Sequence, residues 1–322
     1  MIDMDPRLSE LYEAGAEQDE VSVIIRLTDE ARIPPDVRVV SRFGKIVTAR
    51  LLREAVQRVH DSEDVASMKA SSSVGEGSAW DDDIAESHTE LAASQSLSEA
   101  NPVSVPEDGS GVVVGICDWG FDFTHANFRN EDGTTRLLAL WHQGADGGET
   151  PAPYGYGRVY TKDEINRALA TPDPTATLGY HPSIGDPRGN GAHGTHVSDI
   201  LAGNRREPGS EVGLASGADI VFVHLARQRL DELQNFGDSV RLLEGLDFVR
   251  QQADRKPLVA HFSAGMTGGP HNGTALFAQA VDAMVLERPG IALVQSVGNY
   301  ASSRMHTHGP VSYTHLRAHE TF

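Results

Sequence analysis

The hydrophobic positions near the start of the chain predict a small module of strands with one helix. Val21, Val23 and Ile25 occupy every second position, as in a strand with one buried face. Helical spacing of apolar residues over 51–60 predicts an amphipathic helix. Further short strands are predicted over 37–40, 46–48 and 65–70. We therefore interpret residues 20–70 as a small α+β module that follows an N-terminal segment, residues 1–19.

From Gly111 onward, the pattern changes to an alternation of strands and helices. The continuous apolar run over 112–117 is typical of a strand that is buried on both faces of a sheet. The turn-rich sequence between Asp118 and His193 is interpreted as an elaborate surface insertion. The βαβ alternation predicts an α/β fold with a mostly parallel sheet and helices on both faces. The remaining predicted strands cover 220–223, 258–262 and 291–295, and the predicted helices cover 193–203, 240–253 and 274–288.

The amino-acid composition indicates a linker, disfavours nucleic-acid binding and excludes an intrachain disulfide. Residues 71–106, rich in serine, glycine and acidic side chains, have the composition of a flexible linker. The 46 acidic and 27 basic residues give a net charge of -19, which disfavours binding to nucleic-acid phosphates. The single cysteine, Cys117, excludes an intrachain disulfide and is expected to be a small buried apolar residue.

The sequence predicts neither a membrane span nor a secretory signal. No apolar run approaches the roughly 20 residues of a membrane helix. The start of the chain lacks a basic flank followed by an apolar segment. We therefore expect no membrane association and a cytoplasmic location, unless export uses another route or the true start of the protein lies upstream.

Three short segments place a carboxylate, an imidazole and an amide at the ends of predicted elements. Asp118 directly follows the buried strand, and His193 begins the helix in the segment His-Gly-Thr-His-Val. Such a carboxylate can orient a histidine that acts as a general base. Asn299 ends the segment Ser-Val-Gly-Asn after the last predicted strand, where a side-chain amide can donate to a developing oxyanion.

In this order, the segments resemble the subtilisin-like serine proteases, whose triad runs Asp, His, Ser. The resemblance implies a three-layer peptidase domain over residues 107–310, which is incomplete here, and serine endopeptidase activity on peptide or protein substrates. It implies that Asp118 and His193 belong to the triad and that Asn299 donates to the oxyanion. It also implies a substrate-binding strand that pairs with an extended peptide; its residues are Ser263, Ala264 and Gly265.

The resemblance extends to other parts of the chain. The module at 20–70 resembles the propeptide of many subtilases, which implies an inhibitor-like partner in cis and a self-cleavage point near 68–71. The stretches 128–136 and 160–167 are similar to an insertion in bacterial subtilases related to the spore-germination Csp proteases. Trp119 stands where the family usually has Ser or Thr and is expected to crowd that turn. Ser198-Asp199 replaces the small Ala-Gly pair that is common after the histidine motif.

Some of the same residue types also occur in metal sites, nucleotide-binding motifs and turns. His193 and His196 could face a zinc ion from one helix, but no His-Glu-x-x-His segment or cysteine pair accompanies them. The glycines between 109 and 115 precede and enter a strand, whereas those of a dinucleotide fingerprint follow one. The alternative to a catalytic role is that Asp118 only forms the turn after the buried strand. Calcium sites are common in the subtilases, but no loop of recognisable oxygen-ligand spacing appears, so no cofactor is predicted.

Four further polar residues receive structural interpretations. His224 and His261 fall on predicted strands and are expected to be packed or surface residues. Asp122 and Asn127 are expected to form turns rather than to act in catalysis.

The nucleophile of the family is missing from this chain. In the subtilases it lies in a Gly-Thr-Ser-x-Ala segment several elements after the oxyanion asparagine, and no such segment follows Asn299. Residues 311–322 match what a transposase-type sequencing adapter would encode, so we interpret them as adapter-derived; a divergent natural tail is the alternative. Two functions follow. The first is a serine endopeptidase that this fragment leaves inactive, and the second is a non-catalytic, subtilase-like binding or regulatory pseudoprotease.

Overall fold

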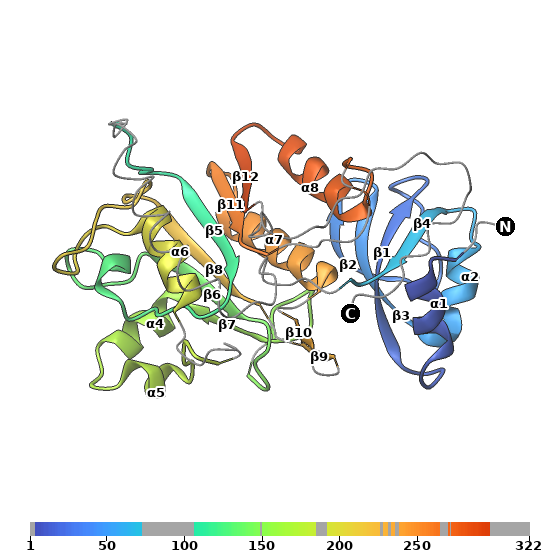
Figure 1. Ribbon diagram of the computed structural model, residues 1–322, viewed down its shortest axis with the longest axis horizontal. Coiled ribbons are helices and arrows are strands. Elements are labelled where there is room, and N and C mark those ends of the chain that lie inside the picture. The colour runs from blue at the N-terminus through green and yellow to red at the C-terminus, as the bar shows by residue number, and fades with distance from the viewer. Residues whose placement is uncertain are drawn as a thin grey trace, which may run out of the picture.

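A four-stranded sheet and a six-stranded sheet, each with helices packed against it, form most of the described chain (Figure 1). The computed structural model describes residues 4–72, 106–148, 150–184, 192–225, 228–230, 233–235, 238–264, 270 and 272–296. Within these ranges, no helix is long and apolar enough to cross a membrane.

The N-terminal part forms an antiparallel sheet with strand order β2-β3-β1-β4. Its side chains alternate between two apolar layers, because successive residues of a strand point to opposite faces. Val23 and Ile25 share one layer with Leu8 of α1, whereas Ile24 and Phe43 belong to a layer on the other face. The elements are α1 (Pro6–Glu13), β1 (Glu20–Leu27), β2 (Arg38–Phe43), β3 (Ile46–Leu52), η1 (Arg53–Ala55), α2 (Val56–His60) and β4 (Val65–Ala70).

The four predicted strands of this module are confirmed, but the start of its predicted helix is wrong. Leu51 and Leu52 continue β3 and pair with Val21 and Glu20 of β1. The α-helix begins only at Val56, after the short η1 turn. Helix α1 was not predicted, and its Leu8 is completely buried against the sheet.

The second sheet has strand order β12-β11-β5-β8-β6-β7, in which all neighbours are parallel except the antiparallel pair β6 and β7. Helix α6 covers one face, and α7 and α8 cover the other (Figure 1), so the predicted parallel sheet between helices is confirmed. The elements are β5 (Val113–Asp118), η2 (Ala126–Phe128), β6 (Leu137–His142), β7 (Arg158–Thr161), α4 (Lys162–Leu169), α5 (Pro174–Leu178), α6 (His193–Ala202), β8 (Asp219–His224), β9 (Gln228–Leu230), β10 (Leu233–Asn235), α7 (Ser239–Ala253), β11 (Leu258–Phe262), α8 (Leu276–Leu286) and β12 (Ile291–Gln295).

The interpretation of the sequence between Asp118 and His193 as a surface insertion is wrong for one part of it. Strand β6 lies inside the sheet, between β8 and β7. Leu140 and Trp141 of this strand are completely buried. Strand β6 is paired on both sides, parallel to β8 and antiparallel to β7, and most of its side chains are buried, so it is a structural part of the domain.

The two sheets are joined through α7 and α8, which lie between them (Figure 1). Apolar side chains of the N-terminal sheet, including Phe43 and Ile46, belong to the same buried cluster as residues of α7 and α8 such as Leu246 and Ala280. One continuous apolar core therefore spans both parts.

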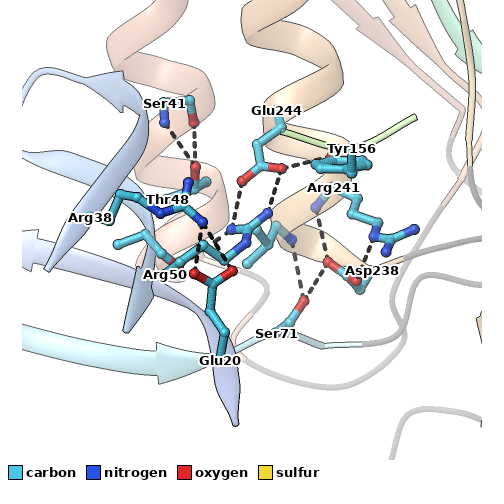
Figure 2. A network of polar contacts seen from close by, with 12 residues as sticks. Glu20, Arg38, Ser41, Thr48, Arg50, Ser71, Tyr156, Asp238, Arg241 and Glu244 are labelled. Carbon is cyan, nitrogen blue, oxygen red and sulfur yellow. Dashed lines mark hydrogen bonds and ion pairs between the residues drawn. The ribbon is translucent and has the colours of Figure 1, made fainter. Parts of the chain in front are cut away.

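A buried ion pair crosses the same contact (Figure 2). The guanidinium nitrogens of Arg50 in β3 lie 2.8 and 2.9 Å from the two carboxylate oxygens of Glu244 in α7, and the two side chains are 8% and 0% exposed. The hydroxyl of Tyr156 donates to the same carboxylate at 2.7 Å. Burial and the charge of Glu244 raise the pKa of Tyr156 well above its usual value, so this hydroxyl keeps its proton.

The residues after β4 are also attached to the start of α7. The hydroxyl of Ser71 donates to Asp238, the N-cap residue of α7, at 2.6 Å. Ser72 and Ser239 exchange two hydrogen bonds, since each backbone N–H donates to an oxygen of the other residue. The chain thus leaves the N-terminal sheet along the start of α7.

Candidate active site

A buried carboxylate and a half-exposed imidazole meet at the end of the central strand β5. The Nδ1 atom of His193 lies 2.7 Å from Oδ1 of Asp118. Asp118 is completely buried, whereas the side chain of His193 is 35% exposed. Because a carboxylate accepts a hydrogen bond, the proton of the neutral imidazole is held on Nδ1. Asp118 thus fixes both the tautomer and the direction of a ring that reaches the surface.

The first turn of α6 is bound to the loop after Asp118, and this explains the residues of the His-Gly-Thr motif. The backbone N–H groups of Gly194 and Thr195 donate to the carbonyls of Trp119 and Gly120 at 2.6 and 2.9 Å. These groups belong to the helix start, where no intrahelical acceptor exists. The Thr195 hydroxyl also donates to Gly120 and accepts from the N–H of Asp122. The motif therefore holds the histidine and the aspartate at a fixed separation.

Glycine is required at position 194 by the closeness of this contact. A Cβ atom there would lie 2.5 Å from the carbonyl oxygen of Trp119 and 2.7 Å from Cζ of Phe222. Both distances are shorter than real contacts of a Cβ atom, so any side chain would push α6 away from β5.

Trp119 covers one face of the candidate base. Its ring is stacked on the imidazole of His193, with ring centroids 4.1 Å apart and an interplanar angle of 8°. Its backbone N–H donates to Asp118 at 2.7 Å, and the residue is only 3% exposed. The turn accommodates this large side chain by packing it against His193.

Two further histidines lie in the same row of the sheet as Asp118. His224 of β8 is paired with Asp118 and with His142 of β6. Burial lowers the pKa of His224 to about 3 and that of His142 to about 4. The Tyr180 hydroxyl lies 2.8 Å from Nδ1 of His224 and donates to the carbonyl of Phe121. These imidazoles are neutral packing groups beneath the site, in agreement with the interpretation of His224 as a packed residue.

The segment after β11 contains the described part of the predicted substrate-binding strand. The Oγ atom of Ser263 lies 2.8 Å from Nε2 of His261, and Ala264 is buried. Burial lowers the pKa of His261, and the negative charge of Asp118 acts in the opposite direction. Gly265 and Asn299 lie outside the described residues, as do residues 311–322.

The other polar residues of the region serve the structure. Asp122 accepts from the N–H and the hydroxyl of Thr124, as expected of a turn residue. Asn127 is completely buried and does more than form a turn, since its amide donates to Asp199 at 2.7 Å and to Ser210 at 3.1 Å. The carboxylate of Asp199, which belongs to α6, is thereby hydrogen-bonded.

The possible metal ligands and the cysteine can be located among the described residues. Within the described ranges, no three His, Cys, Asp or Glu side chains come together in a way that could hold a metal ion. Cys117 is buried, and burial raises the pKa of its thiol far above the usual value, as expected of a small apolar packing residue.

Comparison with known proteins gives the chain its family. A sequence model of the subtilase family matches residues 109–315, which is more than half of the chain. This chain is a subtilase. The predicted fold class and family are confirmed by this match.

Two solved structures are similar to this subtilase. The CspB protease of Clostridium perfringens is 26% identical with a TM-score of 0.48, and the match covers 59% of this chain and 37% of that protein. The epidermin leader peptide processing serine protease (EpiP) from Staphylococcus aureus is 12% identical with a TM-score of 0.43, and the match covers 86% of this chain and 59% of that protein. The subtilase chain therefore matches less than two thirds of the length of either. No curated protein matches it.

Sequence reasoning alone missed three features of the site of this subtilase. The hydroxyl bridge of Thr195 follows from its place in the motif and could have been inferred from it. The nearness of His261 to Asp118 follows from register, because β11 and β5 are parallel neighbours that pair His261 with Ile116. The stacking of Trp119 on His193 has no signal in sequence spacing.

Proposed function

We propose that this subtilase is derived from a serine endopeptidase in which Asp118 and His193 are the acid and the base of the triad. The observation that carries this proposal is the 2.7 Å contact between Nδ1 of His193 and the buried carboxylate of Asp118. A base that is oriented through Nδ1 and reaches the surface is what activation of a hydroxyl nucleophile requires.

The proposed chemistry is acyl transfer to a serine. His193 accepts the proton of the attacking hydroxyl and later returns it to the leaving amine, while Asp118 stabilises the imidazolium that forms between these steps. Asn299 and a backbone N–H stabilise the tetrahedral oxyanion. In subtilisin, removal of one such donor lowers the turnover number about 100- to 1000-fold. Ser263, Ala264 and Gly265 bind the backbone of the substrate peptide.

Residues 311–322 are interpreted as adapter-derived, so the nucleophile is proposed to be a serine encoded downstream of residue 310 in the source gene. No Gly-Thr-Ser-x-Ala segment occurs in the 322 residues, so we expect the chain as printed to be inactive. Amplifying and resequencing the source locus across the codon for Gly309 tests this directly. A frame that continues to Gly-Thr-Ser-x-Ala supports the proposal, and a genomic frame that ends at Phe322 contradicts it.

A biochemical test complements the sequencing. The purified chain is incubated with a generic peptide substrate, in parallel with its His193→Ala variant. We expect no turnover from either protein. Turnover by the parent chain that the substitution abolishes would mean that a nucleophile is present after all, and the proposal of a missing serine would be wrong.

The N-terminal module is proposed to act as a propeptide-like partner in cis. Its support is the continuous apolar core that it shares with α7 and α8 and the buried pair of Arg50 and Glu244. Processing is proposed near residues 68–71, where the chain runs along the start of α7. N-terminal sequencing of the mature full-length protein tests the cleavage, since an intact Met1 would contradict it.

The second candidate function is a pseudoprotease that keeps the cleft for binding. The two candidate functions differ in whether the full-length gene product carries a nucleophilic serine. A serine-reactive fluorophosphonate probe on the full-length gene product distinguishes the two functions. Labelling that requires His193 supports the endopeptidase, whereas an unlabelled but folded product supports the binding protein.

A further inference from the structure

Trp119 makes two contacts with the candidate catalytic pair and one with the residue that follows His193. Its ring lies parallel to the imidazole of His193, with centroids 4.1 Å apart. Its backbone N–H donates to the same Oδ1 atom of Asp118 that contacts His193. Its carbonyl accepts from the N–H of Gly194, the residue after His193. The two backbone contacts do not involve the indole, whereas the stack depends on an aromatic side chain.

A stacked indole affects the two protonation states of His193 differently. The face of an aromatic ring carries negative electrostatic potential and attracts a cation, most strongly for tryptophan, and the attraction grows when water is excluded. Trp119 is 3% exposed, so the contact is largely dry. An imidazolium is therefore stabilised by this ring more than a neutral imidazole is.

Two other groups among the described residues interact with His193. Asp118 on β5 favours the imidazolium through its charge. His261 on β11 is close enough for its charge to interact with that of His193, and burial lowers the pKa of His261, which favours its neutral form. Trp119 thus adds an uncharged source of stabilisation to the charge of Asp118.

We propose that Trp119 is a positioning residue that holds the His193 ring in line with Asp118 and stabilises its protonated form. This inference rests on the proposed role of His193 as general base, in which an imidazolium must form and persist beside the tetrahedral intermediate. A serine or threonine at this position, as is usual in the family, has no aromatic face to offer.

The alternative is that Trp119 only fills space, and a graded set of variants separates the two roles. Trp119→Phe keeps an aromatic face of weaker attraction, whereas Trp119→Leu keeps an apolar side chain without one. Phe222→Leu is the matched packing control, because Phe222 is buried close to Gly194 and stacks on Phe121 rather than on His193.

The experiment follows the titration of the imidazole by NMR in the chain as it exists, with histidine-selective carbon labelling. The signal of His193 is assigned by its loss in His193→Gln. We expect the pKa of His193 to fall by about 0.5 to 1.5 units in Trp119→Leu, which is roughly a 3- to 30-fold loss of proton affinity, and by less in Trp119→Phe. The Phe222→Leu variant is expected to titrate like the parent.

A second measurement needs no change at position 119. A protonated imidazole that touches an indole quenches its fluorescence, so the tryptophan emission of the parent chain is expected to fall as His193 gains its proton. The same pH step is expected to be missing from His193→Gln. This readout keeps the proposal testable even when Trp119→Leu does not fold.

Specific results overturn the inference. If the pKa of His193 is the same in the unsubstituted chain and in Trp119→Leu, Trp119 is only a packing residue. The same conclusion follows if the pH step in tryptophan emission persists unchanged in His193→Gln. Neither readout requires a nucleophile. An inactive full-length protein would therefore contradict the proposed endopeptidase and leave the inference about Trp119 to be decided by these titrations.

Discussion

The buried ion pair between Arg50 and Glu244 gives a quantitative test of how the N-terminal module is attached. Removing one partner of a buried pair leaves an uncompensated charge in the interior, which costs about 3–5 kcal/mol of folding free energy. Removing both leaves none. Since the two side chains are 8% and 0% exposed, Arg50→Met and Glu244→Gln are each expected to fall in that range. Glutamine can still accept from Tyr156, so the double variant retains that hydrogen bond.

The assay is a double-mutant cycle measured by urea denaturation. The buried Trp141 is a suitable fluorescent reporter, since its ring lies 5.2 Å from that of Tyr156 beside the contact. We expect the double variant to lose less than the sum of the single losses, with a coupling free energy of about 2–3 kcal/mol.

An exposed pair in the same module supplies the control. Arg38 and Glu20 are 2.8 Å apart, but both side chains are 52% exposed (Figure 2). Arg38→Met and Glu20→Gln are expected to couple by less than about 1 kcal/mol, because solvent screens such a pair. If the coupling of Arg50 with Glu244 is as small as that of the control pair, the contact is solvated and the reasoning about a joined core is wrong.

Three further predictions concern the site and its surroundings. Gly194→Ala should destabilise the fold by about 1–3 kcal/mol in thermal denaturation, because its Cβ would collide with a backbone carbonyl; an unchanged melting temperature would contradict the close contact. Thr195→Val should lose about 1 kcal/mol and Thr195→Ser much less, as measured by urea denaturation, because valine removes the side-chain hydroxyl that bridges the turn and serine keeps it; equal losses would rule out a contribution of this bridge. The lowered pKa values of His142 and His224, about 4 and about 3, predict full stability above pH 6.5 and a loss of about 1.4 kcal/mol per pH unit for each histidine as the pH falls towards those values. Replacing both by Gln should flatten that acid-side slope, and an unchanged slope would assign it to other groups.

The strands and helices of the second sheet could be predicted from the sequence because burial imposes a period on them. The predicted strand over 258–262 and the predicted start of a helix at His193 agree with β11 and α6. The apolar run over 137–141 forms β6, but turn-rich sequence surrounds it on both sides and obscures the pattern of a strand. Local periodicity is therefore informative where turns separate elements cleanly and weak where a strand is embedded in loops.

The contacts that define the site and the module depend on separations that no local pattern encodes. Asp118 and His193 were brought together from motif order, although 75 positions separate them. Arg50 and Glu244 are 194 positions apart, and nothing in either neighbourhood indicates a partner. The stack of Trp119 on His193 depends on the orientation of two rings, which only coordinates give.

The continuous core between the N-terminal sheet and α7 and α8 has a consequence for how the two parts could separate. All of its described contacts lie within residues 4–72 and 106–296, so a cut between 73 and 105 removes none of them. Such a cut changes the molecularity of the contact, because a tethered partner has a fixed effective concentration and a free one is subject to dilution. The fraction of α7 and α8 covered by the module would then depend on protein concentration. Each tenfold dilution would reduce the free energy that favours the bound state by about 1.4 kcal/mol.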